Sequence, residues 1–278
     1  MPAVGMEYRF PFIGVQSWGT QTIEPIAQVI VRPDETSIGK MPNEDSQSLI
    51  FDTTNLFKVD KFSGWDRVEG GGRANVGVQY TAQFNKAGYL NMAFGQSYRL
   101  FGLNSFAVRD QTNTGLDTGL DTNVSDYVAS AAYMPTTLYG FTSRFAFDHD
   151  DFTVKRFELE TRMNLKRWSM TLVYGSYAPQ PDRGFPNRSQ GLLSTITFYL
   201  ATNWVITGST RYDLTANQFT TFNLGLAYVD DCILFGVSYA TNYYPANIQP
   251  PDQRVMLQIS LRTLGGSSVG QVVSGTAK

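Results

Sequence analysis

Side chains of two kinds alternate along the stretch from Gln218 to Thr241. Large apolar residues occupy one parity on each side of a turn at Asp230-Asp231: Phe222, Leu224, Leu226, Tyr228, Ile233, Phe235, Val237 and Tyr239. Small or polar residues fill the positions between them. Because successive side chains of a strand point to opposite faces, the pattern predicts a β-hairpin whose two faces meet different solvents. Each arm is close to the length with which a tilted strand crosses a hydrocarbon layer, about 9–11 residues.

The same alternation recurs along most of the chain and predicts about thirteen antiparallel strands. Besides the two arms of the hairpin, the predicted strands are 3–12, 21–32, 66–84, 89–98, 123–133, 139–147, 155–164, 167–177, 189–199, 203–212 and 253–262. Pro25 weakens the second of these locally, since proline cannot donate to a ladder. The predicted fold class is therefore all-β.

The connections between the predicted strands alternate in length from residue 66 onward. Short turns are predicted at 85–88, 134–138, 165–166, 200–202 and Asp230-Asp231, and the connections between them are mostly longer. Two long loops, 33–65 and 102–122, lack alternation, and we expect the second to be too polar and glycine-rich for a core. The alternation of short and long connections puts all short turns on one rim of the sheet, which is typical of outer-membrane barrels with periplasmic turns and external loops. A soluble β-sandwich, the alternative, shows no such regularity.

Composition narrows the function classes. The chain has 278 residues, of which 42% are hydrophobic and 14% aromatic, without the long apolar run of a transmembrane helix. Aromatic residues at this level fit the girdles of a membrane barrel, although a large soluble β-protein has a similar composition. The net charge of -2 argues against a nucleic-acid partner, because nucleic-acid binders normally carry a basic excess.

The ends of the chain suggest a piece of a larger protein. The opening MPAVGMEYRF lacks the basic and apolar regions of a secretory signal. Single-chain bacterial barrels normally have an even number of strands, so an odd count points the same way. We therefore expect residues 1–264 to be the C-terminal half of a larger transmembrane β-barrel, an open curved sheet in isolation. Residues 265–278 are expected to be a flexible tail.

Residues with catalytic or metal-binding potential are few. His149 is the only histidine and lies in the sequence Asp148-His149-Asp150-Asp151. This cluster could bind a divalent cation through its oxygens, but a polar external loop explains it equally well, so no metal site is assigned. A phospholipase would need a serine–histidine pair with an orienting group, which one histidine in an acidic loop does not indicate. The sequence predicts neither an enzyme nor a cofactor.

Six segments, in their order along the chain, are similar to a known family. They are VGMEYRFPF at 4–12, PNEDSQS at 42–48, DTTNLF at 52–57, FSGWDRVEGGGRANVGVQY at 62–80, FGQSYRL at 94–100 and LRTLG at 261–265. Together they resemble the C-terminal region of the LptD family of lipopolysaccharide-assembly proteins. Members of that family have a periplasmic β-jellyroll followed by a very large barrel, so the resemblance implies about the last half of that barrel.

The resemblance implies a function and partners. It implies transport of lipopolysaccharide (LPS) into the outer leaflet of the outer membrane of a Gram-negative bacterium, with membrane lipid around the barrel. The implied protein partners are a plug lipoprotein of the LptE type and a periplasmic bridge protein of the LptA type. LPS would leave through a seam between the first and last strands, and the last strand would contribute Val255, Leu257, Ile259 and Ser260. The alternative is a self-contained, porin-like diffusion channel of the outer membrane.

Cys232 is the only cysteine and follows a short turn, which places it on the predicted periplasmic rim. An unpaired cysteine in an exported protein favours pairing elsewhere, because the periplasm is oxidising. The resemblance implies a disulfide to a segment outside this chain. The best-known members carry two adjacent cysteines here, whereas Asp231 precedes Cys232, which leaves one bridge. The alternative is an unpaired, small buried residue.

Charged residues on the predicted wet face are candidate contacts for the anionic sugar-phosphate groups of LPS. The candidates are Arg73, Arg144, Arg156, Glu158, Glu160, Arg162 and Arg211. An ordinary hydrated barrel interior would show the same charges, so both readings remain open at this point.

Overall fold

The computed structural model describes residues 1–244, 250–261 and 271–274, and its strands form one open antiparallel sheet. The strand order is β1-β3-β4-β5-β6-β7-β8-β9-β10-β11-β12-β13-β14-β15, with β2 also paired to β3. From β3 onward, neighbours in the chain are thus neighbours in the sheet. Within the described residues, no helix is long and apolar enough to cross a membrane.

The described residues form fifteen strands where about thirteen were predicted, and most of them lie where the alternation placed them. They are β1 (Val4–Arg9), β2 (Phe12–Gln16), β3 (Gly19–Arg32), β4 (Gly71–Phe84), β5 (Tyr89–Phe101), β6 (Tyr127–Met134), β7 (Tyr139–Phe147), β8 (Val154–Asn164), β9 (Trp168–Tyr177), β10 (Ser189–Tyr199), β11 (Trp204–Asp213), β12 (Gln218–Val229), β13 (Ile233–Asn242), β14 (Asp252–Leu261) and β15 (Gln271–Ser274). The one helix among the described residues is a 3-10 turn at Pro181–Arg183.

Three boundaries differ from the prediction. The predicted strand 3–12 covers β1 and only the first residue of β2, and these two strands pair with successive parts of β3 on either side of Pro11. Proline lacks the N–H that a ladder needs, so the pairing breaks there. The strand expected from residue 66 begins only at Gly71. Most of the predicted tail and Arg262 lie outside the described residues, whereas Gln271–Ser274 pair with β14.

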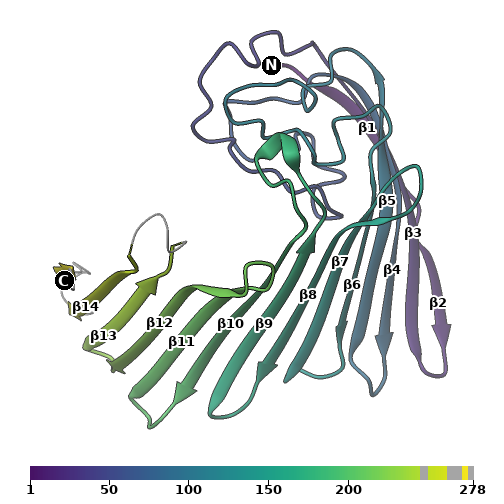
Figure 1. Cartoon of the computed structure of the whole chain (residues 1–278). Coiled ribbons are helices and arrows are strands. Elements are labelled where there is room, and N and C mark those ends of the chain that lie inside the picture. The colour runs from purple at the N-terminus through teal and green to yellow at the C-terminus, as the bar shows by residue number, and fades with distance from the viewer. Residues whose placement is uncertain (245–249, 262–270, 275–278) are drawn as a thin grey trace. The chain divides into compact units, whose positions relative to one another are not determined.

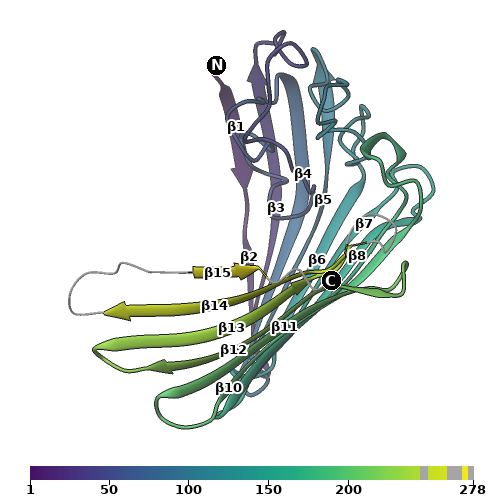
Figure 2. The same cartoon turned by 60° about the vertical axis from the view of Figure 1, so that its left-hand side comes forward.

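The chain divides into two compact units. The first comprises residues 1–136, 141–159 and 176–189, and the second comprises residues 137–140, 160–175 and 190–278. In the second unit, β10 to β14 run side by side as successive hairpins (Figure 2). Tight turns join the members of each hairpin, as the connection lengths predicted.

The register in the second unit separates the two faces as expected. Leu226 lies opposite Val237 and, across the next ladder, Val237 lies opposite Leu257. These positions are exposed, so this face is a continuous apolar surface. On the other face, Asn223 lies opposite Ala240, and its amide donates to the Ser209 hydroxyl at 3.0 Å. One face therefore suits lipid and the other suits water.

The sheet of the first unit has the same apolar outer face, but its inner face is covered. Along β3, Val29 and Val31 are exposed, whereas Gln28 and Ile30 on the opposite face are buried. The cover is formed by the connections 33–70, 102–126 and 178–188, which we call the loop layer. Figure 1 shows these connections gathered at one end of the strands of the first unit, away from the tight turns.

The loop layer has a hydrophobic core, which contradicts the expectation that 102–122 is too polar for one. The buried cluster comprises Ile38, Leu49, Phe51, Leu56, Phe62, Phe106, Leu120, Val128 and Ala146. The first seven belong to the loops, and Val128 and Ala146 come from the inner face of β6 and β7. Scattered apolar residues of the loops are sufficient for a core because the sheet supplies the opposite wall.

A glycine pair permits the close approach of the loop layer. Gly77 of β4 lies opposite Gly95 of β5 on the inner face. A Cβ on Gly95 would lie 2.5 Å from a methyl group of Leu56, and one on Gly77 would lie 3.1 Å from the Phe57 ring. The residues of the DTTNLF segment therefore pack directly on the backbone of the sheet.

Candidate functional site

The polar face of the first unit carries a buried charged cluster beneath the loop layer. Lys61 Nζ lies 3.2 Å from Glu69 Oε1, and Arg73 Nη1 lies 2.5 Å from Glu69 Oε2. Lys61 Nζ also lies 3.4 Å from Asn75 Oδ1. Burial lowers the pKa of Lys61 to about 8, although the Glu69 carboxylate opposes this shift. Two cations share one carboxylate here, so the cluster is costly to bury and depends on complete pairing.

Arg73 was predicted to face the lumen, and the structure places it in this cluster. Its Nη2 donates to the backbone carbonyl oxygens of Lys58 and Val59. The side chain therefore fastens loop 33–70 to β4. A role of Arg73 in contacting substrate remains a prediction, and its Nη1 and Nη2 groups already bind residues of the loop.

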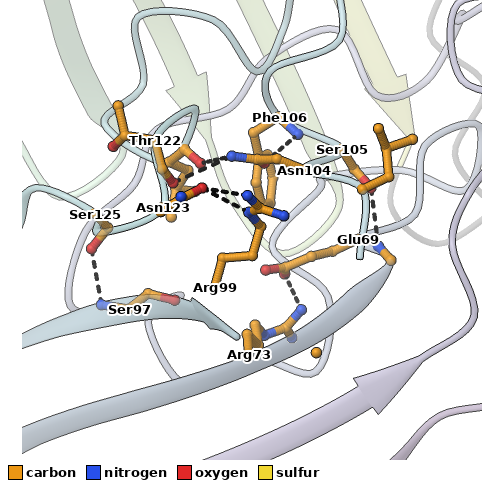
Figure 3. A pocket seen from close by; sticks show the side chains of 14 residues that line it. Glu69, Arg73, Ser97, Arg99, Asn104, Ser105, Phe106, Thr122, Asn123 and Ser125 are labelled. Carbon is orange, nitrogen blue, oxygen red and sulfur yellow. Dashed lines mark hydrogen bonds and ion pairs between the residues drawn. The ribbon is translucent and has the colours of Figure 1, made fainter. Parts of the chain in front are cut away.

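A small pocket beside Arg73 is also lined by polar groups that bind one another (Figure 3). Arg99 of β5 donates its Nε to Asn123 Oδ1 at 3.0 Å. The backbone N–H of Ser97 donates to the Ser125 hydroxyl at 2.9 Å. These contacts hold loop 102–126 against the end of β5, so the pocket belongs to the packing of the loop layer.

Three of the predicted polar-face residues lie together on β7 and β8. Glu158 lies between two arginines, with Arg144 Nη1 at 3.6 Å from Oε2 and Arg156 Nε at 3.8 Å from Oε1. Tyr177 donates its hydroxyl to Glu158 Oε1 at 2.8 Å. Arg156 is buried, while Arg144 and Glu158 are half-buried. This group brings two positive charges and one negative charge together on the inner face.

The remaining predicted polar-face residues lie in the second unit. Glu160 and Arg162 form an ion pair within β8. Arg211 is exposed and lies opposite Thr221 on the face that also carries Asn223. The structure thus places these residues on the polar face, and none of the seven candidates is thereby shown to contact substrate.

A second charged cluster lies where β6 begins and β7 ends. Lys155 Nζ lies 2.9 Å from Asp126 Oδ1 and 2.7 Å from Asp148 Oδ2, and His149 Nδ1 lies 3.7 Å from Asp126 Oδ1. Burial raises the pKa of the Asp126 carboxyl, and the hydrogen bond from Lys155 lowers that of Asp148 to about 2. The sequence drew attention to residues 148–151 but not to Asp126, which only the pairing of β6 with β7 brings close.

Cys232 lies exposed in the turn between β12 and β13 and forms no disulfide within the described residues. Its backbone N–H donates to Asp230 Oδ1 at 2.8 Å, which fixes the turn. The alternative of a small buried residue is therefore wrong, because the side chain is exposed. The bridge to a segment outside this chain remains a prediction.

The predicted exit strand is β14. Val255, Leu257 and Ile259 lie on its apolar face, opposite Tyr239, Val237 and Phe235 of β13. Ser260 lies on the other face, opposite Leu234. On the free edge, β15 pairs with Arg254–Leu257, and the register stops there within the described residues. The part of the edge around Ser260 has no further partner among the residues described.

Comparison with known sequences identifies the family. The family profile "LptD: LPS transport system D" matches residues 1–184, which is most of the chain. This chain belongs to the LptD family. The resemblance seen in the motifs is thereby confirmed, and so is its assignment to a transport and assembly family instead of a family of enzymes.

Curated relatives carry the same family name. The LPS-assembly protein LptD of Aliivibrio fischeri is 25% identical over 288 residues, covering 92% of this chain and 34% of that protein. The LPS-assembly protein LptD of Pectobacterium atrosepticum is 27% identical over 293 residues, covering 96% of this chain and 36% of that protein. The chain thus spans about a third of the length of these relatives.

Solved structures give a looser likeness. A porin of Rhodopseudomonas blastica is 11% identical, with 97% of this chain and 89% of that chain covered and a TM-score of 0.38. A KdgM porin is 13% identical, with 85% and 90% covered and a TM-score of 0.25. At these scores the likeness says nothing about activity.

The LptD assignment and the sheet with an apolar outer face agree with the predicted location, the outer membrane of a Gram-negative bacterium.

Proposed function

We propose that this chain is the C-terminal barrel region of an outer-membrane translocon that delivers LPS to the outer leaflet. The family match over residues 1–184 carries the proposal. It is supported by a sheet whose outer face is apolar and exposed while its inner face is polar. No catalytic group is required, because moving an amphiphile is a matter of partition between water and lipid.

The two faces of the sheet suit the two halves of LPS. The sugar-phosphate part would move along the hydrated inner face, where Arg144, Arg156 and Glu158 present charge. Acyl chains are excluded from water and gain roughly 0.8 kcal/mol per CH2 group on entering hydrocarbon. A lateral opening would therefore let the chains enter lipid while the sugars stay wet.

The seam for this lateral release is proposed at β14. In the closed barrel, β14 is proposed to pair with the first barrel strand of the intact protein. An unpaired backbone group costs several kcal/mol in lipid. The two strands of the seam must therefore be hydrogen-bonded in the absence of LPS and separate only transiently when LPS leaves. Ser260 lies on the part of β14 beyond its pairing with β15, which makes it the best position for a test.

The partners proposed are LPS, a plug lipoprotein of the LptE type and a periplasmic bridge protein of the LptA type.

Cys232 is proposed to form a disulfide with a cysteine outside this chain. Its exposure in a tight turn supports that role. Non-reducing electrophoresis of the intact protein should show a mobility shift that Cys232→Ser abolishes, and an unchanged mobility would remove the bridge.

A cross-link across the seam tests the release step. A cysteine at Ser260, oxidised to a cysteine on the first barrel strand of the intact protein, should block delivery of LPS to the cell surface. The matched control joins Asn223→Cys to Ala240→Cys, which lie opposite each other in a hairpin that stays paired. Normal surface LPS with the seam cross-link fully formed would rule out the seam while leaving the barrel assignment intact.

The porin-like alternative is disfavoured by the loop layer. A diffusion channel needs a water-filled path, whereas loops with their own hydrophobic core cover the inner face of the first unit. In a planar bilayer, the intact protein should therefore conduct ions poorly compared with a porin. Steady porin-like conductance would restore the alternative.

A further inference from the structure

The cluster of Asp126, Asp148 and His149 has the make-up of a metal site. It lies in the first unit at the rim with the long connections, where β6 begins and β7 ends. Each residue offers one ligand atom, and these atoms lie within 4.8 Å of one another. Asp126 comes from a segment of the chain distant from the other two, so the fold, not a local turn, brings the three together.

The Nδ1 atom of His149 is not satisfied by the protein, whereas Nε2 lies 3.4 Å from Asp150 Oδ1. The Nδ1 atom is enclosed and has no hydrogen-bond partner. The nearest carboxylate oxygen, Asp126 Oδ1, is 3.7 Å away, which is too long for a hydrogen bond. Leaving a buried polar nitrogen unpaired is destabilising, because the desolvation of the atom is not compensated by a hydrogen bond. A ligand placed between Nδ1 and the carboxylates would remove that cost.

The two carboxylates are held in place by their surroundings. Asp126 is enclosed, with 3% of its side chain exposed, and Gly119 lies against it. A Cβ on Gly119 would lie 2.2 Å from Asp126 Oδ2, so only glycine lets the loop layer close over this carboxylate. Asp148 Oδ1 accepts from the Asp150 backbone N–H at 2.8 Å, while its Oδ2 lies near Lys155.

A cation already occupies the position between the carboxylates. The Lys155 ammonium contacts both of them, and the side chain is 39% exposed. Two carboxylates side by side require a positive charge, and a lysine at the surface of the cluster supplies one such charge. Because this side chain borders solvent, it can turn outward and give its place to another cation.

We propose that Asp126, Asp148 and His149 bind a divalent transition-metal ion, best Zn2+, in competition with the Lys155 ammonium. Imidazole nitrogen and carboxylate oxygen are both zinc ligands, at about 2.0–2.2 Å, with water able to complete a tetrahedral shell. Calcium and magnesium prefer oxygen ligands alone, so the histidine favours zinc over them. The bound ion would join the start of β6 to the turn after β7.

Zinc titration of the intact protein in detergent micelles tests the proposal. After treatment with a chelator, the wild type should bind one Zn2+ in calorimetry. Asp126→Asn and His149→Ala should each weaken that binding at least tenfold, because each removes one ligand. Lys155→Met should tighten it, because the competing ammonium is gone. Asp151→Asn, in the same turn but outside the cluster, is the matched control and should leave the affinity unchanged.

The sign of the Lys155→Met effect makes the test decisive. A variant that merely disturbs folding weakens binding, whereas Lys155→Met should tighten it because the positive charge that competes for the two carboxylates is removed. Weaker or unchanged binding in that variant would overturn the proposal, as would zinc binding insensitive to His149→Ala. Equal affinity for Ca2+ and Zn2+ would remove the histidine as a ligand and overturn it as well.

Discussion

Lys61 is a charged residue that lies fully buried in a segment whose sequence suggests an exposed loop. Lysine is almost never fully buried unless it is paired. Its partners are Glu69 on a later part of the same loop and Asn75 on β4. Nothing in the local sequence predicts this burial, because the environment is created by the sheet beneath and the loop above.

The pKa of Lys61 gives the loop layer a dependence on pH. Its value is about 8 in the folded layer and 10.5 as the ordinary value, because burial penalises the charged form. Between these pH values the unfolded layer binds a proton that the folded layer does not. The free energy of unfolding therefore rises with pH through this window, by ~1.4 kcal/mol for each pH unit within it. Below pH 8 both states are protonated, and the full cost of burying the charge is present.

Limited proteolysis of the loop layer checks this dependence. Between pH 7.5 and 9.5, cleavage near Trp65 should slow roughly tenfold more in the wild type than in Lys61→Met, which lacks the titrating group. The comparison of the two proteins removes the effect of pH on the protease. An identical response of both proteins would contradict the low pKa.

At the scale of the element, the strands and their faces were predictable because the signal is local. The hairpin of β12 and β13 has the parity that its sequence indicates, with Leu224 on the apolar face and Asn223 on the polar face. Boundaries were less predictable. Pro11 splits one predicted strand, and β4 begins at Gly71 with a register shift between Gly72 and Arg73. Such changes depend on the partner strand, which a single segment does not reveal.

Arginine substitutions on the two faces of β12 should have unequal effects. Leu224→Arg should lower the stability of the barrel by roughly 2–4 kcal/mol if the position faces mid-bilayer lipid. Asn223→Arg should cost much less, because its neighbours Ser209 and Ala240 lie on the wet face. The fraction of assembled barrel on semi-native electrophoresis measures both. Equal losses at the two positions would refute the assigned faces.

At the scale of the whole molecule, the sequence predicted the arrangement of connections but not what the long ones do. Connection length alternates along the chain, which places the tight turns on one rim. The loop layer was missed because its buried residues, such as Phe51 and Leu120, recur with no period. Asp126 was missed as a cluster member because it lies far from Asp148 in the chain, and the sequence does not show that the two residues come into contact. Local periodicity yields strands, whereas sites built from distant loops need the assembled sheet.

The orientation of the chain in the membrane follows from that arrangement and is open to direct labelling. On a Cys232→Ser background, a cysteine at Trp65 should react with a membrane-impermeant maleimide in intact cells, because Trp65 lies on the long-loop rim and is 91% exposed. A cysteine at Lys166, in the tight turn between β8 and β9, should react only after the cells are lysed. Both positions are exposed in the structure, so burial cannot explain a difference, and only the membrane can hide one of them. Labelling of Lys166→Cys but not of Trp65→Cys in intact cells would invert the topology and place the proposed metal site, together with the loop layer, in the periplasm.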